Sequence, residues 1–526
     1  MTTSVERSTA RGSASAHLLI DFVAAQADSQ PQGIAVSYGA TIWTWSQWHE
    51  RIRRAASAMC DAGIVSGDRI AFIDKVNPAC LEVLLAATSL GVVTASINWR
   101  LASDELAYIL GDCQPRIVFA GADIAASIVE INDGFADTQV VTLGGDDDQY
   151  EQFLATARGV PADGVVRPED DALVVYSSGT TGRPKGVLIS QRALVQHAVC
   201  LEGYWPLSAG DTNFLAAPLF HVAGLSQAMW GIRAGVRTIY SSEMSVASVV
   251  DAIAEGATHA MLVAPVIAAL IGGHDSVCDA VGRLKYLGYG AAPAPVALVQ
   301  RAAALWPEVN LVQAYGQTEL SGLATQLGPD DHRDSAQPQR LASVGAVVAG
   351  VEARVTDLST GAVLPADVQG ELWFRSRYCM SGYLNRPDDT AHTLSADGWL
   401  RTGDVGHVDA DGYVYIDDRL KDMIISGGEN VYSSEVERVL YEHPAVIEAA
   451  VIGVPDEQWG ESVKAFVASS SPLRTEEIVE FCRGRLAGYK CPKTVEFVSA
   501  LPRNAAGKVL KRELREPSQS AEPSSS

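Results

Sequence analysis

Residues 176–187 have the sequence YSSGTTGRPKGV. The stretch is dominated by Ser, Thr and Gly, and it contains two cations, Arg183 and Lys185. It is too polar to pack as a core element, but its dense backbone N–H groups, hydroxyls and cations suit a loop that wraps a polyphosphate. Apolar, β-forming residues flank it at 172–176 and 186–189. We therefore expect a loop held between two strands.

Two other interpretations of this loop have to be weighed. A Walker A loop requires Gly-Lys-Ser/Thr at the start of a helix. Here Pro184 precedes Lys185, Gly186 follows it, and the next residues are typical of a strand. The Walker A pattern therefore fails, and a plain surface loop remains as the alternative without function.

Length, charge and cysteine content restrict the class of protein. The chain has 526 residues and a formal net charge of −23. Its length favours two or more domains, and its charge argues against nucleic acid or an anionic membrane as the main partner. The eight cysteines include no C-x-x-C pair. We expect reduced thiols in a cytoplasmic protein, with neither a zinc site nor a disulfide framework.

Two segments bear on membranes and secretion. Residues 1–16 contain no apolar stretch, so we expect no secretion signal there. Residues 83–99 lack charge and could suggest a membrane span, but Gly91 lies in the middle and β-branched residues follow it. This pattern predicts a buried helix, a glycine stop and a buried strand, with no integral membrane association.

Helix and strand patterns alternate to about residue 300, which predicts an α/β fold with sheets layered by helices. Thr44 and Gln47 form a capping box that opens one of these helices. Short strands dominate beyond about residue 340, and a small α+β domain follows the charged residues 417–422. We expect a disordered N-terminus at 1–16, a large multi-subdomain domain at 17–417, a hinge at 418–421, a small mobile domain at 422–515 and a disordered tail at 516–526.

A basic run stands out in this acidic chain. Residues 483–515 contain nine Lys or Arg and only two acids, Glu496 and Glu513. Such a run is either a solvated basic face or a surface that meets a polyanion. The Gly-bearing turn at 502–508, which ends in Lys508, favours the second interpretation.

Further motifs follow the first loop in a fixed order: GAAP at 290–293, YGQTE at 315–319, RTGD at 401–404, DRLKD at 418–422, SGGEN at 426–430 and a lysine at 508. Together with residues 176–187 they resemble the motifs of the adenylate-forming superfamily. That superfamily comprises acyl-CoA synthetases, luciferases and peptide-synthetase adenylation domains. The resemblance covers nearly the whole folded chain, and fatty-acid-CoA ligases look most similar.

The resemblance implies a site for ATP. Tyr315 would lie against adenine, Thr318 would bind phosphate, and Asp404 and Arg419 would contact the ribose. Relatives often have Gly where Ala291 stands, which puts the backbone contact there in doubt. The ATP-binding residues implied are Ser177, Ser178, Gly179, Thr180, Thr181, Gly182, Lys185, Gly290, Ala291, Tyr315, Thr318, Asp404, Arg419 and Lys508.

The resemblance also implies catalytic, metal-binding and thiol-binding roles. Lys508, Glu319, Thr181 and His221 would be catalytic, and Glu319 with Thr181 would hold Mg²⁺. Lys421 would be the pivot about which the small domain rotates between two half-reactions. The residues implied at the coenzyme A tunnel are Gly427, Gly428, Glu429, Trp459 and Lys490.

The acid-binding pocket is the least determined part. His221 is either a buried core histidine or a residue that gates the pocket. Adenylation domains for amino acids usually carry Asp directly after the equivalent of Phe220, so His221 at that position indicates a substrate without an amino group. Candidate lining residues are apolar or small and favour a fatty, aryl or alicyclic acid: Leu219, His221, Val222, Gly224, Trp230 and Gly288.

These implications together describe an acid–thiol ligase that makes acyl-AMP from ATP and a carboxylic acid, then transfers the acyl group to coenzyme A. A luciferase-like monooxygenase and an adenylation enzyme that loads a carrier protein are the alternatives. A non-catalytic nucleotide-binding regulator would be expected to have lost Lys508 or Glu319, and both are present. A monomer and a homodimer both remain open.

Overall fold

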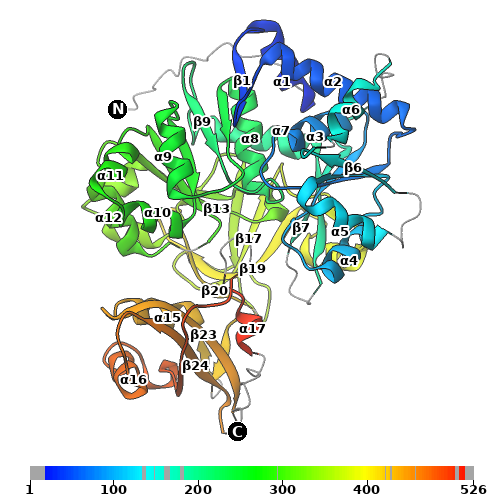
Figure 1. Cartoon of the computed structure of the whole chain (residues 1–526). Helices are drawn as coiled ribbons and strands as arrows, with labels where there is room; N and C mark the ends of the chain where they lie inside the picture. Colours follow the sequence, from blue (N-terminus) through cyan, green and yellow to red (C-terminus); the bar gives the residue numbers. More distant parts are fainter. Residues whose placement is uncertain are drawn as a thin grey trace, which may run out of the picture.

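We describe the protein from a computed structural model (Figure 1). The structure describes residues 18–132, 138–146, 148–158, 166–177, 183–292, 294–420, 422–426, 429–456, 458–503 and 509–515. The predictions made for residues 1–16, 178–182, 421, 427–428, 508 and 516–526 lie outside these ranges.

Two large sheets form the centre of the N-terminal part. The nine-stranded sheet has the order β15-β14-β13-β12-β11-β9-β10-β1-β2, and the seven-stranded sheet has the order β18-β8-β7-β4-β3-β5-β6. The strands of the first are β1 (Ile34–Tyr38), β2 (Thr41–Thr44), β9 (Thr212–Leu215), β10 (Arg237–Tyr240), β11 (His259–Leu262), β12 (Tyr286–Gly290), β13 (Asn310–Tyr315), β14 (Thr325–Leu327) and β15 (Ala346–Val347). Those of the second are β3 (Arg69–Ile73), β4 (Val93–Ser96), β5 (Ile117–Gly121), β6 (Gln139–Leu143), β7 (Asp171–Ser177), β8 (Lys185–Ser190) and β18 (Gly382–Tyr383). The inner strands pair in parallel, as expected of an α/β fold.

Helices cover these sheets (Figure 1). They are α1 (Ile20–Ser29), α2 (Trp45–Asp61), α3 (Ala79–Ser89), α4 (Ser103–Cys113), α5 (Ala122–Asn132), α6 (Gln149–Ala155), α7 (Gln191–Leu201), α8 (Val222–Ala234), α9 (Val246–Ala254), α10 (Ala264–Ile271), α11 (Asp275–Val281), α12 (Val296–Leu305) and α13 (Pro329–Arg333), with 3₁₀ turns η1 (Thr318–Leu320) and η2 (Pro338–Ala342). Helices α2, α3, α7 and α8 share one hydrophobic core with strands of both sheets.

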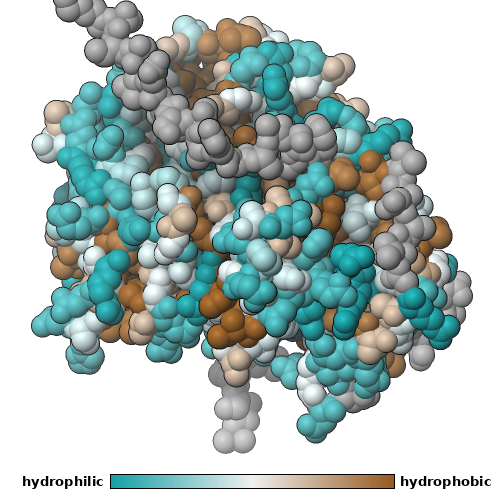
Figure 2. Space-filling view, turned by 90° about the horizontal axis from the view of Figure 1, so that it is seen from above, coloured by the Kyte–Doolittle hydropathy of each residue, from teal (hydrophilic) through white to brown (hydrophobic). Residues whose placement is uncertain are grey.

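The uncharged segment at 83–99 has the predicted structure. Helix α3 is buried along almost its whole length, and Gly91 follows it with φ +71°, a left-handed conformation that ends the helix before β4. None of the helices in the described ranges has the length and apolarity needed to cross a bilayer. Seen from above, the surface is largely hydrophilic, with apolar residues in scattered small groups (Figure 2).

A third, four-stranded antiparallel sheet has the order β16-β17-β19-β20. Its strands are β16 (Val351–Thr356), β17 (Gly370–Ser376), β19 (Trp399–Val408) and β20 (Val414–Arg419), and α14 (Pro387–Thr393) precedes β19. It is the β-rich subdomain expected after residue 340. In Figure 1 its strands run from the large part of the molecule toward the small C-terminal part.

The C-terminal part has its own sheet and its own apolar core. Its elements are β21 (Ile424–Ser426), β22 (Glu429–Val431), α15 (Ser433–Tyr441), β23 (Val446–Asp456), β24 (Gly460–Ser469), α16 (Thr475–Arg483), η3 (Gly488–Lys490), β25 (Thr494–Phe497) and α17 (Lys511–Arg515). Asp418 and Arg419, which we expected in the hinge, are instead the last residues of β20, because they pair with β19. Ser433 at the start of α15 donates to Asp418 through its backbone N–H and its hydroxyl, which ties the small sheet to this strand.

Candidate active site

The polyphosphate loop predicted from the sequence joins two paired strands. β7 and β8 run antiparallel, and Ser177 lies opposite Lys185. The five residues between 178 and 182 fall outside the described ranges, but both ends of the loop are fixed by a ladder that continues into the buried interior. The expected strand–loop–strand arrangement is therefore present.

Lys185 is already paired in this structure. Its Nζ lies 2.8 Å from Asp389 Oδ1 on α14 and 5.2 Å from the centre of the Tyr383 ring. The Tyr383 hydroxyl donates to Glu319 Oε1 at 2.8 Å. The contacts link the end of the loop to Glu319 through one aromatic side chain. The sequence motifs gave no indication of Tyr383 or Asp389.

Asp404 is the meeting point of three motifs. Its side chain is buried, Oδ2 accepts from the Tyr315 hydroxyl at 2.5 Å and from Gln317 Nε2 at 2.8 Å, and Oδ1 lies 2.5 Å from Arg419 Nε. Asp404 and Arg419 are directly opposite each other on β19 and β20, and Tyr315 ends β13. Residues from YGQTE, RTGD and DRLKD thus converge on one carboxylate.

The electrostatics of this cluster follow from burial and charge. Burial raises the pKa of Tyr315 well above its ordinary value, and the Asp404 carboxylate raises it further, so the phenol stays protonated and donates. Burial alone would lower the pKa of Arg419, but Asp404 and the weaker contributions of Tyr315, Glu319 and Asp422 together outweigh it, and the net shift is upward. The cluster is a fixed hydrogen-bonding unit at neutral pH.

The turn after β12 passes close to β13. A Cβ on Gly290 would lie 2.3 Å from the Ala314 carbonyl oxygen, so no larger residue fits there. Ala291 has φ +63°, in the left-handed region that disfavours a side chain. This explains why a glycine would suit position 291, and the alanine there is held in a strained conformation.

Glu319 and Thr318 belong to the short turn η1, and the Glu319 carbonyl accepts from the backbone of Met380 at 2.9 Å. In the described ranges, no group of three or more His, Cys, Asp or Glu is arranged to hold a metal ion. Glu319 is linked through Tyr383 to Lys185, at the end of the loop predicted to bind phosphate. A single carboxylate in such a place suits Mg²⁺, which is commonly held by one or two carboxylates together with substrate phosphates.

His221 is the N-cap residue of α8, and its side chain is partly buried. Burial lowers its pKa to about 4, with a further contribution from Arg100, so the imidazole is neutral at pH 7. Its Nε2 is buried and has no hydrogen-bond partner within the described ranges. A buried polar atom without a partner calls for one that is supplied from elsewhere, such as a ligand or water.

An apolar cavity of about 70 Å³ lies between α8 and the sheet edge formed by β12, β13 and β14. Trp230 and Gly288, two of the candidate residues of the acid-binding pocket, line it. Leu219, His221, Val222 and Gly224 do not line it, because Leu219 packs into the core and Gly224 closely approaches the carbonyls of Ala217 and Pro218. His197, Trp205, Gln227 and Gln326 also line the cavity, and no sequence motif pointed to them.

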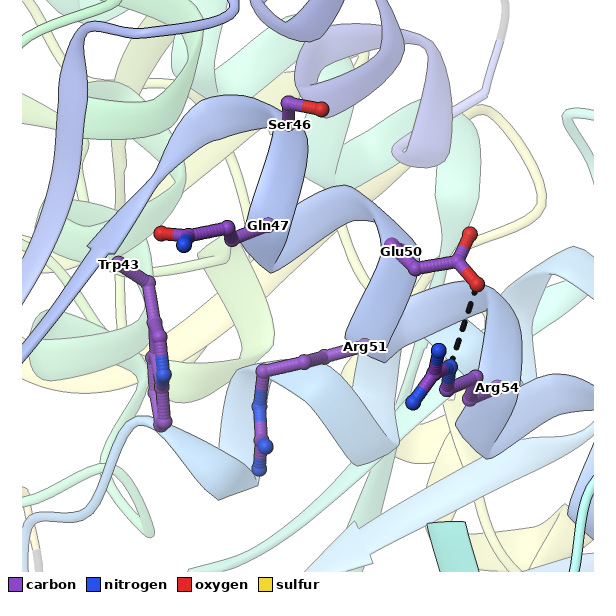
Figure 3. Close-up of a pocket in the computed structure, with 6 residues that line it drawn as sticks. All are labelled: Trp43, Ser46, Gln47, Glu50, Arg51 and Arg54. Atoms are coloured by element: carbon purple, nitrogen blue, oxygen red, sulfur yellow. Dashed lines mark hydrogen bonds and ion pairs between the residues drawn. The ribbon is translucent and has the colours of Figure 1, made fainter. Parts of the chain in front are cut away.

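A larger surface hollow, of about 430 Å³, lies beside α2 and carries none of these motifs (Figure 3). Its charges are paired within the protein: Arg51 bonds to Glu82 at 2.7 Å and to Glu151 at 2.6 Å, and Arg54 bonds to Glu50 at 3.2 Å. Trp43 lies beneath Arg51, at 4.3 Å from its ring centre. The charged residues of the hollow are thus engaged in interactions within the protein, which gives them a structural role.

Comparison with protein families decides the class. The family described as AMP-binding enzyme matches residues 23–384, and the AMP-binding enzyme C-terminal domain matches residues 435–508. This chain belongs to the AMP-binding enzyme family. It is therefore an ATP-dependent ligase of the adenylate-forming superfamily, as the sequence motifs indicated.

Similar proteins differ in acid and in acceptor. A fatty acid–[acyl-carrier-protein] ligase, ScoC of Streptomyces coeruleorubidus, is 34% identical over 95% of this chain and 96% of its own length. A feruloyl-CoA synthase of an Amycolatopsis species is 35% identical over 93% of this chain and 97% of its own. The ATP-bound structure of MatB from Rhodopseudomonas palustris superposes with a TM-score of 0.86 at 30% identity, covering 94% of this chain and 98% of that one. The family membership is shared, but the substrates named are not.

The small domain of this AMP-binding enzyme carries the residues implied for coenzyme A. Trp459 is 40% exposed, and Lys493 Nζ lies 4.4 Å from its ring centre. Glu429 is exposed on β22, and Lys490 is paired with Glu435 at 2.8 Å.

Much of the basic run at 483–515 is also paired with acids from outside the run. The pairs are Arg485 with Glu442, Lys490 with Glu435, Arg503 with Glu448, Lys511 with Glu437 and Arg515 with Asp422. The run is thus less of a free cationic surface than its composition suggested.

Proposed function

We propose that this AMP-binding enzyme is an acyl-CoA synthetase. It would activate an apolar carboxylic acid with ATP as acyl-AMP and then transfer the acyl group to coenzyme A. The observation that carries the proposal is the convergence of Tyr315, Asp404 and Arg419 from three separate motifs on one buried point, with an apolar cavity behind β13.

In the first half-reaction, a carboxylate oxygen of the acid attacks the α-phosphorus of ATP. A new P–O bond forms, the bond to the β-phosphate bridge breaks, and pyrophosphate leaves with the electron pair. Two anions have to meet, so charge neutralisation in a site of low polarity is the main task. Asp404 would accept from the ribose hydroxyls, and Arg419, fixed by Asp404, would present its guanidinium on the phosphate side.

Further positive charge would come from Lys508, which lies outside the described ranges. Glu319 and Thr181 would hold Mg²⁺, which when bound neutralises phosphate charge. Tyr383 would orient Glu319 through the hydrogen bond at 2.8 Å. The neutral His221 at the start of α8 would line the path of the acid without adding charge.

In the second half-reaction, the thiolate sulfur attacks the acyl carbonyl and AMP leaves with the electrons of the C–O bond. The small domain would rotate about Lys421 between the steps, so that the segment at 427–428 replaces Lys508 at the site. The structure suits such a movement because the chain crosses from β20 to β21 in only four residues, 420–423.

Product analysis tests the proposal. Enzyme incubated with a panel of acids, Mg·ATP and coenzyme A should form AMP, pyrophosphate and acyl-CoA in equal amounts. Formation of ADP and phosphate would contradict adenylation. A different outcome is a thioester that forms on a phosphopantetheinyl carrier protein and not on free coenzyme A. That result would support adenylation but would show that the enzyme loads a carrier protein, as the name of the similar ScoC states for that enzyme.

A further inference from the structure

The cavity between α8 and the β12–β14 edge is small. It measures about 70 Å³, whereas a water takes about 30 Å³ of liquid volume and an apolar cavity that binds benzene measures about 150 Å³. The room corresponds to about two waters, so it suits a short chain, and one ring is the upper limit once the walls adjust. A long-chain acyl group is much larger than this room.

The indole of Trp205 forms one wall of this cavity. A Cβ on Gly288 would lie 2.4 Å from Trp205 Cζ3, so the ring lies flush against the glycine backbone of β12. Trp230 Nε1 donates to the Trp205 carbonyl at 2.7 Å. The Trp205 ring also contacts the rings of His259 and Tyr286, at centroid distances of 5.8 and 6.0 Å. Trp205 is therefore a wall with support on its outer side.

The side chains that line the cavity carry no charge. They include no Lys, Arg, Asp or Glu, all of them lie in the described part of the chain, and their single histidine is His197. Burial lowers the pKa of His197 to about 4, which leaves its imidazole neutral at pH 7. A second carboxylate on the acid would enter this cavity without a counter-charge, which is strongly unfavourable.

We propose that the acid activated here has a compact, uncharged acyl group no larger than about one aromatic ring, and that Trp205 sets this size limit. The inference rests on the proposed function, since it takes the cavity as the acyl site. It selects among the fatty, aryl and alicyclic acids that the sequence left open.

The test measures kcat/KM for acid-dependent pyrophosphate release with three kinds of acid. Benzoate and phenylacetate are compact, dodecanoate and hexadecanoate are long, and terephthalate is benzoate with a second carboxylate. The wild-type enzyme should prefer the compact acids over hexadecanoate and over terephthalate by about 10-fold or more.

Variants then examine the wall itself. Trp205→Leu should shift the ratio of long to compact acids by about 10-fold toward the long acids, because a smaller side chain opens the cavity end. Trp205→Phe keeps an aromatic wall and should stay near the wild-type ratio. Trp43→Leu changes a tryptophan at the separate surface hollow of Figure 3 and should leave the ratio unchanged.

The outcomes separate the two levels of the proposal. If the wild-type enzyme prefers hexadecanoate, the size limit is wrong. If it uses terephthalate as well as benzoate, the charge limit is wrong. In both cases the formation of acyl-AMP would still support the proposed function. An unchanged ratio in Trp205→Leu would remove Trp205 from the role. If none of the acids supports pyrophosphate release, the result would count against the proposed function and therefore also against the proposed substrate class. The comparison of acids uses the wild-type enzyme, so it tests the size and charge limits even if a Trp205 variant does not fold.

Discussion

At the scale of single residues, Asp404 has the most demanding role. One buried carboxylate holds Tyr315, Gln317 and Arg419 at distances of 2.5 to 2.8 Å. Hydrogen bonds to a charged group contribute about 1.5–3 kcal/mol each. A ribose that bonds to Asp404 therefore meets an acceptor whose position is fixed before ATP arrives.

We predict that Asp404→Asn lowers kcat/KM for ATP by about 10- to 100-fold, because an amide oxygen is a weaker acceptor and no longer neutralises Arg419. Steady-state kinetics with ATP varied would measure it, with melting temperature as a check on folding. Asp411→Asn, which removes an exposed partner of Arg340 near the same sheet, is the matched control. Equal kinetics for the Asp404 variant and wild type would exclude Asp404 from nucleotide binding.

Ala291 offers a test of backbone strain. At φ +63°, a β-branched side chain is much less acceptable than the methyl group of alanine. Ala291→Val should lower the free energy of unfolding by about 1–3 kcal/mol, whereas Ala291→Gly should be close to neutral. Urea unfolding of both variants would show the difference, and a valine variant as stable as wild type would mean that the turn relaxes freely.

The sequence motifs pointed to Tyr315, Asp404 and Arg419, because each of these residues belongs to a short motif that can be read from the local sequence. Tyr383 and Asp389 could not be predicted, since they reach Glu319 and Lys185 only through the packing of β18 against β8. The cavity residues were missed for the same reason. Gln326 and Trp205 are 121 positions apart and line one cavity only when β14 and the segment that follows α7 are folded together.

At the scale of elements, local signals gave accurate boundaries. Helix α2 starts after Thr44, as its capping box predicts: the Gln47 backbone donates to the Thr44 hydroxyl at 3.3 Å and the Thr44 backbone donates to Gln47 Oε1 at 2.9 Å. The hinge at 418–421 stays a prediction. Its residues Asp418 and Arg419 end β20, and partners on β19 and α15 bond to both side chains.

The capping box should be measurable. Thr44→Ala removes the side-chain acceptor and should lower the free energy of unfolding by about 1 kcal/mol. Ser46→Ala, in the first turn of the same helix, removes no capping hydrogen bond and should change the free energy of unfolding by less than about 0.5 kcal/mol. If both variants unfold at the same urea concentration, the cap does not contribute to the stability of the large domain.

At the scale of the whole molecule, stability should depend on pH through buried histidines. Burial lowers the pKa of His197 to about 4, below the ordinary value near 6.5. Between these two values the unfolded chain binds a proton that the folded chain does not. The free energy of unfolding therefore rises with pH across this window. The contribution of His197 is lost again as the pH falls from about 6.5 toward 4.

His197→Gln should remove this contribution. The slope of unfolding free energy against pH, measured by urea unfolding between pH 5 and 6.5, should become shallower by up to about 1.4 kcal/mol per pH unit. His274→Gln changes an exposed histidine and serves as the control. An unchanged slope in the His197 variant would show that this imidazole is protonated in the folded protein.

The α/β class and the division into a large and a small part were predictable, since alternating helix and strand patterns and the change near residue 340 are properties of local sequence. The strand orders were not, because β18 pairs with β8 and β1 pairs with β10 across long stretches of the chain. The net charge of −23 restricted the kinds of partner expected for the whole molecule. It could not show that many cations of the basic run at 483–515 are paired with acids from outside the run.

The central claim, that this site activates a carboxylic acid as its adenylate, is tested most directly by pyrophosphate–ATP exchange in the absence of coenzyme A. The measurement follows the label from pyrophosphate into ATP with each acid of the panel and with no acid. The account predicts exchange that depends on a compact, uncharged acid and on Mg²⁺, and that falls in Asp404→Asn. Exchange that proceeds equally without any acid, or that no carboxylic acid supports in enzyme shown to bind ATP, would contradict it.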